Sequence, residues 1–303
     1  MTEGGSPGAP KRPSEARLYG LIGIMLLFWS ANFVVGKIAL REFPPLLLSG
    51  LRTALAALFI LPVFFWSRRL RLPTGSLRRD LTAVVCAGLI GVALNQVFFV
   101  FGLSRTSVAH SAIVIGLTPI LVLLMAAFAA QEHLSGRKII GMGIALAGVI
   151  ALSLAPGKSG GASLVGDMFI FLASLTFAWF TVYGKRVTVR HGAVVVTTVA
   201  YLGAAVALAP LTIALAVRHG LGHVSLTGWA SLVYMALFPS MVCYLIYSYA
   251  LQHIPASRVS AFSYLQPLLA TLIAIPALGE RLGGGLIAGG VLVFAGVWIT
   301  ERT

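Results

Sequence analysis

Acidic residues and cysteine are scarce in this chain of 303 residues. It has 8 Asp and Glu against 22 Lys and Arg, and only two cysteines, Cys86 and Cys243. The acids lie at the ends of apolar runs, in connections or in tails: Glu3, Glu15, Glu42, Asp80, Glu132, Asp167, Glu280 and Glu301. No apolar run has a carboxylate at its middle, which argues against a proton relay of Asp and Glu. The two cysteines fit neither a disulfide framework nor a metal motif.

Motifs that supply energy or catalysis are also missing. The chain has no Walker motif, metal-ligand cluster, nucleophile elbow or redox pair. This argues against an ATP-driven pump and against an enzyme, and we expect neither cofactor nor metal. The net charge of +14 would suggest nucleic acid in a soluble chain. Here the basic residues punctuate apolar runs, as membrane topology requires, so we expect no nucleic-acid partner.

Charge of either sign is rare overall. Charged residues make up 10% of the chain and hydrophobic residues 58%, and the mean hydropathy is +0.96. A soluble domain has roughly 45–50% apolar and about 25% charged residues. A helix that spans a bilayer needs about 20 mostly apolar residues. The composition therefore predicts a polytopic membrane protein and leaves no room for a sizeable aqueous domain.

Ten apolar runs follow a polar tail at residues 1–17, which we expect to be disordered and cytoplasmic. The runs cover residues 18–40, 45–66, 81–103, 107–130, 137–155, 166–185, 193–217, 227–251, 256–278 and 283–300. We expect helices, because hydrocarbon offers backbone groups no partner outside the segment and the runs lack the alternation of barrel strands. The predicted fold is an all-α membrane protein with ten transmembrane helices.

An internal repeat runs through the chain at a constant offset of 148 residues. Matching pairs include Gly36 and Gly184, Lys37 and Lys185, Pro62 and Pro210, Pro119 and Pro267, Glu132 and Glu280, and Gly148 and Gly296. The predicted domains are two five-helix units, residues 18–155 and 166–303, joined by a linker at 156–165. Because five is odd, the second unit must enter the membrane in the opposite sense. Such inverted repeats are typical of carriers that open alternately to the two sides.

The basic residues also orient the chain. Connections and tails on the N-terminal side carry 14 Lys and Arg, those on the other side carry 5, and Lys37, Arg52 and Lys185 lie within runs. The excess predicts that both termini are cytoplasmic.

Polar and aromatic residues recur at helical spacing on several runs, as in Trp29, Asn32, Phe33 and Gly36. Polar groups facing lipid are costly, so these faces should look inward. They form either a substrate cavity or hydrogen bonds and aromatic packing between helices. The predicted substrate-binding set is Trp29, Asn32, Asn95, Phe99, Trp179, Tyr244, Tyr247, Ser263 and Tyr264.

Three further features each admit two interpretations. Pro119 and Pro267 lie near the middle of their runs and mark either hinges in broken helices or static kinks. Lys37 and Lys185 act at gates or simply extend to the interface. Glycines of the fifth and tenth runs serve packing within one chain or an oligomer face.

Arg52 lies about seven residues into the second run, on the order of 10 Å below the outer surface, and needs a partner. We predict a structural ion pair with Glu42, Asp167 or Glu280. A substrate carboxylate is the alternative.

The segments FWSANFVVGK (28–37) and LSGLRTALA (48–56), with the twin segments at 117–149 and 265–297, resemble the EamA-domain transporters of the drug/metabolite transporter superfamily. The resemblance extends over essentially the whole chain after residue 17. It implies ten helices in an inverted arrangement of five plus five. It also implies a central cavity and carriage of amino acids or related metabolites, often outward. Asn32, Lys37 and Arg52 match the family pattern.

We therefore predict a bacterial inner-membrane secondary transporter that moves small metabolites by alternating access. Neutral or zwitterionic amino acids are the expected cargo, and export the expected direction. The alternatives are an exporter of lipophilic cationic drugs or, in other classes, a channel or a lipid-modifying enzyme. The expected partners are the substrate and the bilayer, and no oligomer is predicted. The exact substrate and the coupling ion stay open.

The inverted repeat makes a direct prediction about topology. Single cysteines placed near positions 37 and 185 of a cysteine-free chain should react with an impermeant thiol reagent from opposite sides of the membrane. Labelling of both from the same side would exclude the inverted arrangement.

Overall fold

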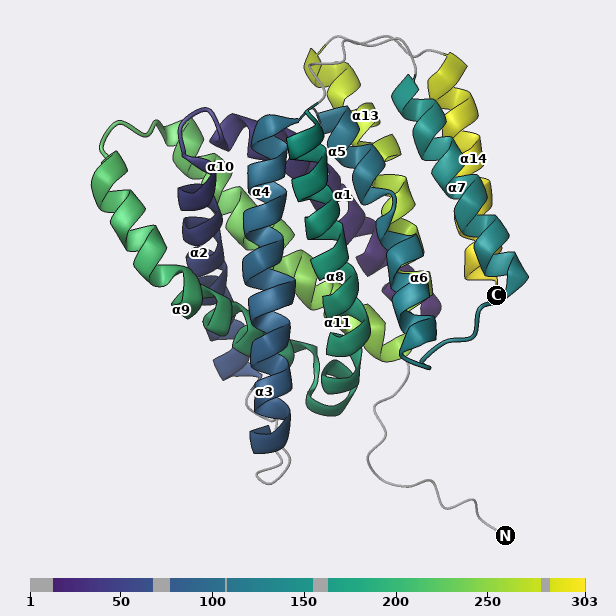
Figure 1. Ribbon diagram of the computed structural model, residues 1–303, viewed down its shortest axis with the longest axis horizontal. Coiled ribbons are helices and arrows are strands. Elements are labelled where there is room, and N and C mark those ends of the chain that lie inside the picture. Colours follow the sequence, from purple (N-terminus) through teal and green to yellow (C-terminus); the bar gives the residue numbers. More distant parts are fainter. Residues whose placement is uncertain (1–12, 68–76, 107, 155–162, 279–283, 303) are drawn as a thin grey trace.

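The computed structural model describes residues 13–67, 77–106, 108–154, 163–278 and 284–302. Within these ranges the secondary structure is helical, and no strand occurs. The helices pack side by side as a bundle (Figure 1). This confirms the expected all-helical class.

The first half of the chain forms a series of helices, two of which are joined by a π-helical segment, η1. The elements are α1 (Glu15–Ala39), α2 (Pro45–Trp66), α3 (Leu77–Gly88), η1 (Leu89–Leu94), α4 (Asn95–Arg105), α5 (Val108–Ile115), α6 (Thr118–Phe128) and α7 (Gly136–Leu154).

The second half repeats this order. Its elements are α8 (Leu164–His191), α9 (Ala193–His219), α10 (Leu226–Met235), the π-helical η2 (Ala236–Val242), α11 (Cys243–His253), α12 (Ala256–Ala261), the 3₁₀ turn η3 (Phe262–Tyr264), α13 (Leu265–Leu278) and α14 (Gly284–Glu301). The starts of α2 and α9, of α4 and α11, and of α7 and α14 each differ by 148 residues. The sequence repeat is therefore also a repeat of helix boundaries.

In the described ranges, six helices are long and apolar enough to cross a membrane. They cover Glu15–Ala39, Pro45–Trp66, Asp80–Arg105, Leu164–His191, Ala193–His219 and Leu226–His253. The apolar runs at 107–130 and 256–278, expected as single spans, are instead divided into α5 and α6 and into α12, η3 and α13. The last apolar run of the first half forms α7, and the last apolar run of the second half forms α14.

Two helices begin earlier than the sequence predicted, because a serine caps each. Ser14 Oγ accepts a hydrogen bond from Arg17 N at 3.4 Å, so α1 takes in residues assigned to the tail. Ser163 Oγ accepts from Gly166 N at 3.3 Å, so α8 begins within the predicted linker. Such side-chain acceptors satisfy N–H groups that have no partner within the helix. Residues 1–12 and 155–162 lie outside the described residues.

Contacts between the halves follow the repeat. Helix α1 packs on α13 and α8 packs on α6, while α2 packs on its counterpart α9 and α7 on its counterpart α14. Figure 1 shows α7 and α14 side by side at one end of the bundle. The largest buried apolar cluster joins α1, α6, α8, α11 and α12, so elements of both halves share one core.

Glycines bring α7 and α14 into backbone contact. A Cβ added at Gly148 would lie 2.7 Å from the backbone N of Val293, and one added at Gly141 would lie 2.9 Å from the carbonyl oxygen of Gly296. Gly296 in turn faces Ala145 and Gly141. These glycines are used for packing within one chain, one of the two interpretations the sequence left open.

Glu132 ties the connection between α6 and α7 to the second half. Its Oε2 accepts from Lys138 Nζ at 2.8 Å and from Ser257 Oγ, and its Oε1 accepts from Ser257 N at 3.0 Å. Gln131 Nε2 also donates to the carbonyl of Val182 at 3.0 Å. The carboxylate therefore joins the end of α6 to the start of α12, as a turn element. Its repeat mate Glu280 lies outside the described residues.

Gly148→Leu should destabilise the protein by about 1–3 kcal/mol, because the new side chain must push α14 away from α7. Gly143→Leu is the matched control on the same helix, since a Cβ there meets nothing within 4 Å. Thermal unfolding in detergent measures both variants. Equal midpoints for the two would contradict the close contact.

The Glu132 network predicts a loss of stability in acid. Burial raises the pKa of the Glu132 carboxyl, but hydrogen bonds from Lys138 and Ser257 outweigh it and hold the pKa below the ordinary value of 4.5. A lowered folded-state pKa contributes stability above about pH 4.5, which is lost as the pH falls through the folded-state value.

Glu132→Gln should therefore lower the unfolding midpoint at pH 7 and flatten its fall between neutral and acid pH. Glu15→Gln changes the charge equally at an exposed site and serves as the control. An unchanged slope in Glu132→Gln would show that other groups cause the acid sensitivity.

Candidate functional site

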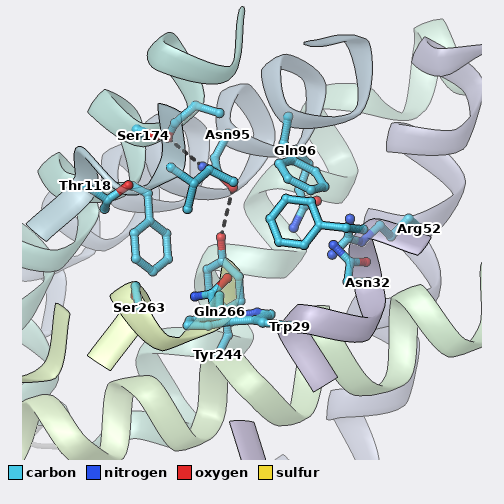
Figure 2. Close-up of a pocket in the computed structure, with 15 residues that line it drawn as sticks. Trp29, Asn32, Arg52, Asn95, Gln96, Thr118, Ser174, Tyr244, Ser263 and Gln266 are labelled. Carbon is cyan, nitrogen blue, oxygen red and sulfur yellow. Dashed lines mark hydrogen bonds between the residues drawn. The ribbon is translucent and has the colours of Figure 1, made fainter. Parts of the chain in front are cut away.

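A cavity lies between the two halves, and the centre of a water-sized sphere can occupy about 90 Å³ of it. It is lined by residues of α1, α2, α4, α5, α6, α8, α11, η3 and α13. Figure 2 shows their side chains converging on it. The lining residues are Trp29, Asn32, Phe33, Arg52, Asn95, Gln96, Phe99, Ile115, Thr118, Ala173, Ser174, Phe177, Tyr244, Ser263 and Gln266.

Several pairs of repeat mates line this cavity. Four pairs of lining residues are separated by the repeat offset of 148: Trp29 and Phe177, Gln96 and Tyr244, Ile115 and Ser263, and Thr118 and Gln266. The cavity thus lies where equivalent surfaces of the two halves meet. The repeat mates of the other lining residues do not line the cavity. The mate of Arg52, for example, is Ala200, which is buried.

Two broken helices reach the cavity. Helix α5 ends at Ile115 and α6 begins at Thr118, with Pro119 in its first turn. In the second half η3 precedes α13, and Pro267 is the third residue of α13. Proline in a first turn removes no hydrogen bond from the helix interior. Both prolines lie in the first turn of the helix that follows an irregular segment, and their role as hinges or static kinks stays a prediction.

Trp29 forms one wall and is held in place by its indole nitrogen. Nε1 donates to the carbonyl of Pro239 in η2 at 3.0 Å. Its ring lies 5.7 Å from the ring of Phe177 and 6.3 Å from that of Tyr244, both edge-on. Edge-to-face contacts of this kind stabilise aromatic clusters. The wall is therefore rigid and apolar.

Asn95 and Tyr244 use their polar atoms to join helices. Asn95 Nδ2 donates to the carbonyl of Ala173 at 2.8 Å, and its Oδ1 accepts from the Tyr244 hydroxyl at 3.1 Å. The pair links α4, α8 and α11 at the cavity (Figure 2). Phe99, one turn further along α4, lines the cavity and packs against Phe33 at 5.8 Å between ring centroids.

Arg52 is buried at the cavity wall without a carboxylate partner in the described ranges. Its side chain is 3% exposed, and Nε donates to Ser240 Oγ at 2.7 Å. Of the acids predicted to pair with it, Glu42 accepts from Ser225, and Asp167 accepts from Thr106 Oγ1 at 2.6 Å. Neither pairs with Arg52, contrary to the expected ion pair, because Glu42 is held by Ser225 at the start of α10 and Asp167 by Thr106 at the end of α4. Glu280, the third candidate, lies outside the described residues.

Three buried polar atoms of cavity residues have no hydrogen-bond partner: Arg52 Nη1, Asn32 Oδ1 and Ser174 Oγ. Leaving a buried donor or acceptor unpaired costs about 1–3 kcal/mol, and more for a charged group. Such atoms are uncommon in native proteins and call for an explanation. Within the described residues no group of three His, Cys, Asp or Glu side chains gathers to hold a metal.

Three predicted site residues do not line the cavity. Tyr247 lies in the core shared by α1 and α11, where its hydroxyl and that of Thr181 are 2.9 Å apart. Tyr264 is buried beside Leu123 and Val293. Trp179 lies against Tyr183, at 5.1 Å between ring centroids, and packs on the buried cluster of Phe180 and Tyr244.

The remaining predicted residues Trp29, Asn32, Asn95, Phe99, Tyr244 and Ser263 do line the cavity. The lining residues outside the predicted set are Phe33, Gln96, Ile115, Thr118, Ala173, Ser174, Phe177 and Gln266, besides Arg52, which was assigned a structural role. The repeat offset would have found three of them: Phe177 as the mate of Trp29, Gln96 as the mate of Tyr244 and Ile115 as the mate of Ser263.

Lys37 and Lys185 occupy equivalent places. Lys37 Nζ donates to the carbonyl of Thr106 at 2.7 Å, and Lys185 Nζ donates to that of Ile254 at 2.9 Å. These carbonyls follow the last residues of α4 and α11 and are themselves repeat mates. A cation at a helix C-terminus is stabilising. Each lysine therefore caps a helix of its own half, and a part in gating stays a prediction.

Comparison with known proteins finds relatives named as transporters or efflux pumps that match nearly the full length of this chain. An inner membrane transporter of Escherichia coli (strain K12) is 29% identical over 294 residues, which cover 93% of this chain and 90% of the relative. A transporter of Archaeoglobus fulgidus is 27% identical over 282 residues, 93% of this chain and 98% of that one. A Salmonella typhimurium protein named a probable amino-acid metabolite efflux pump is 26% identical over 285 residues, 91% and 92% of the two chains.

A solved crystal structure shares the fold with a TM-score of 0.74 at 19% identity, covering 95% of this chain and 98% of that one. The model of the EamA-like transporter family matches twice, at residues 18–154 and 164–302. These two matches coincide with the two series of helices, α1–α7 and α8–α14. The chain belongs to the EamA-like transporter family, and is a membrane protein built from two EamA domains.

Proposed function

We propose that this protein exports small metabolites, chiefly neutral or zwitterionic amino acids, across the bacterial inner membrane by alternating access. The observation that carries the proposal is the cavity lined by repeat mates from both halves. A site between two equivalent units can open to either side when the units exchange conformations. The substrate then binds near the middle of the membrane.

The proposed topology has ten spans, with the halves inverted and both termini in the cytoplasm. It is supported by the loop charges and by the helix boundaries that recur at the repeat offset. Six of the spans correspond to the long apolar helices, and the broken helices and the pair α7 and α14 supply the other four.

The core cluster of α1, α6, α8, α11 and α12 supports a conformation closed toward the N-terminal side. In α1 its members Leu18, Ile22 and Met25 precede the cavity residue Trp29. In α11 Ile246 and Ala250 follow the cavity residue Tyr244. The Glu132 network lies among the same elements. Under the proposed topology these contacts close the cytoplasmic side and must separate for substrate to enter from there.

The proposed cargo and direction of transport are supported by the names of relatives and by the residues that line the cavity. The Salmonella typhimurium relative is named a probable amino-acid metabolite efflux pump, which favours outward movement of amino-acid metabolites. Aromatic walls of Trp29, Phe99 and Phe177 suit an apolar side chain, and the amide and hydroxyl groups suit a polar end. Lipophilic cations are a poorer match, because Arg52 is the charged side chain in the lining and has positive sign.

Proteoliposomes loaded with an amino-acid panel should show counterflow for at least one member. Asn32→Ala and Tyr244→Ala should each lower that exchange about tenfold, which corresponds to roughly 1.4 kcal/mol of lost interaction. Tyr183→Ala, at an outward-facing aromatic, is the control and should exchange at the wild-type rate. Lack of exchange across a broad metabolite panel would contradict the proposal, and flux without saturation would indicate a channel.

A further inference from the structure

We infer that Arg52 is a substrate-binding residue whose guanidinium binds a carboxylate of the transported molecule, and that Asn32 beside it accepts a hydrogen bond from a donor on the same molecule. The inference rests on the proposed function and names the chemical group that the cavity recognises. Under this inference Arg52 acts by direct contact with the substrate and not through an internal ion pair.

The charge of Arg52 needs a counter-charge. An arginine side chain stays protonated in proteins, and a buried cation without an anion is strongly destabilising. In the described part of the chain Arg52 makes one hydrogen bond, from Nε to Ser240 Oγ, and Nη1 has no partner. Ser240 is neutral and donates onward to the carbonyl of Met235 at 2.9 Å. Among the residues that the structure describes, Ser240 thus orients the guanidinium and none neutralises it.

The cavity supplies no anion of its own. Its fifteen lining residues include amides, hydroxyls and aromatic rings, and Arg52 is their one side chain with a formal charge. An anion that enters the cavity therefore meets a single fixed positive charge at the wall. Guanidinium N–H groups bind carboxylate and phosphate with good geometry. One arginine matches one carboxylate, whereas a doubly charged phosphate would call for further cations.

Asn32 adds the complementary atom. Figure 2 shows Asn32 and Arg52 next to each other at one end of the cavity. Asn32 Oδ1 is buried and unpartnered, so it is an acceptor in need of a donor. A free donor on arginine beside a free acceptor on asparagine suits a carboxylate with a neighbouring amine or hydroxyl. The α-amino acid head group has this arrangement, and its side chain would extend toward Trp29 and Phe177.

The test uses matched compounds and the full chain. L-Phenylalanine and L-leucine are compared with their carboxamides, which lack the carboxylate, and with their N-acetyl derivatives, which keep it. Exchange is measured in proteoliposomes, and binding by thermal stabilisation of the protein in detergent. The wild-type protein should bind both carboxylate forms, and the carboxamides at least tenfold more weakly.

Arg52→Gln should weaken binding of the carboxylate compounds by about 10–100-fold, the usual worth of a hydrogen bond to a charged group, and should abolish the preference over carboxamides. Arg52→Lys, which keeps the charge, should keep part of that preference. Ser240→Ala should weaken carboxylate binding while leaving carboxamide binding unchanged, because it frees the guanidinium to move. Arg105→Gln removes the same charge at an exposed site over the Phe101 ring and should behave as wild type.

A purely structural arginine would give a different result. Its replacement would lower the unfolding midpoint and weaken both classes of compound alike, which would overturn the inference. If Arg52→Gln does not fold, the same comparison is made with Arg52→Lys and Ser240→Ala, and an unchanged preference in both overturns it.

The same measurements distinguish a failure of the Arg52 inference from a failure of the proposed function. Carboxylate-dependent stabilisation that Arg52→Gln removes, without exchange of any compound in proteoliposomes, would support the Arg52 site and contradict the carrier. Exchange of amino acids and their carboxamides at equal rates would support the carrier and contradict the Arg52 site. Neither stabilisation nor exchange with any compound would contradict both.

Discussion

The need to pair every backbone polar group inside hydrocarbon shapes this molecule. Where the chain is apolar it forms continuous helices, because only a helix satisfies its N–H and C=O groups within one segment. The helix breaks between α5 and α6 and at η3, and residues at these breaks line the cavity. A proline lies in the first turn of the helix that follows each of these points, where a missing N–H costs less than in a helix interior. Irregular backbone is thus placed where polar surface is of use.

The cavity lies where equivalent positions of the two repeats meet, and sequence differences between the repeats make its two ends unlike. Trp29 and Phe177, or Thr118 and Gln266, are equivalent positions that meet near the boundary of the halves. The capping lysines Lys37 and Lys185 have kept the same structural task in both halves. Arg52 and Asn32 have not, since their mates are the buried apolar residues Ala200 and Phe180. The positive charge therefore stands at one end of an otherwise uncharged site. A ligand bound there is oriented with respect to the two halves, head group toward α1 and α2.

The polar residues around the cavity fall into those whose hydrogen bonds join helices and those with atoms left unpaired. Asn95 and Tyr244 satisfy each other and the backbone of α8, so they hold three helices in register. Arg52 Nη1, Asn32 Oδ1 and Ser174 Oγ leave part of their hydrogen-bonding capacity unused. Fully satisfied networks make a membrane bundle rigid. Unsatisfied atoms at a cavity are the ones that a ligand can still stabilise.

The sequence by itself determined that the chain is helical and membrane-spanning, and that it repeats at an offset of 148 residues, because these properties depend on composition and on local order. Only the tertiary structure decided which face of each helix turns inward. Lipid is as apolar as the protein core, so hydrophobic periodicity cannot mark the buried side of a membrane helix. For that reason Trp179 was expected in the cavity where Phe177 stands. An ion pair was expected for Arg52, whereas folding brings it to Ser240, 188 residues away, and leaves the rest of its guanidinium at the cavity.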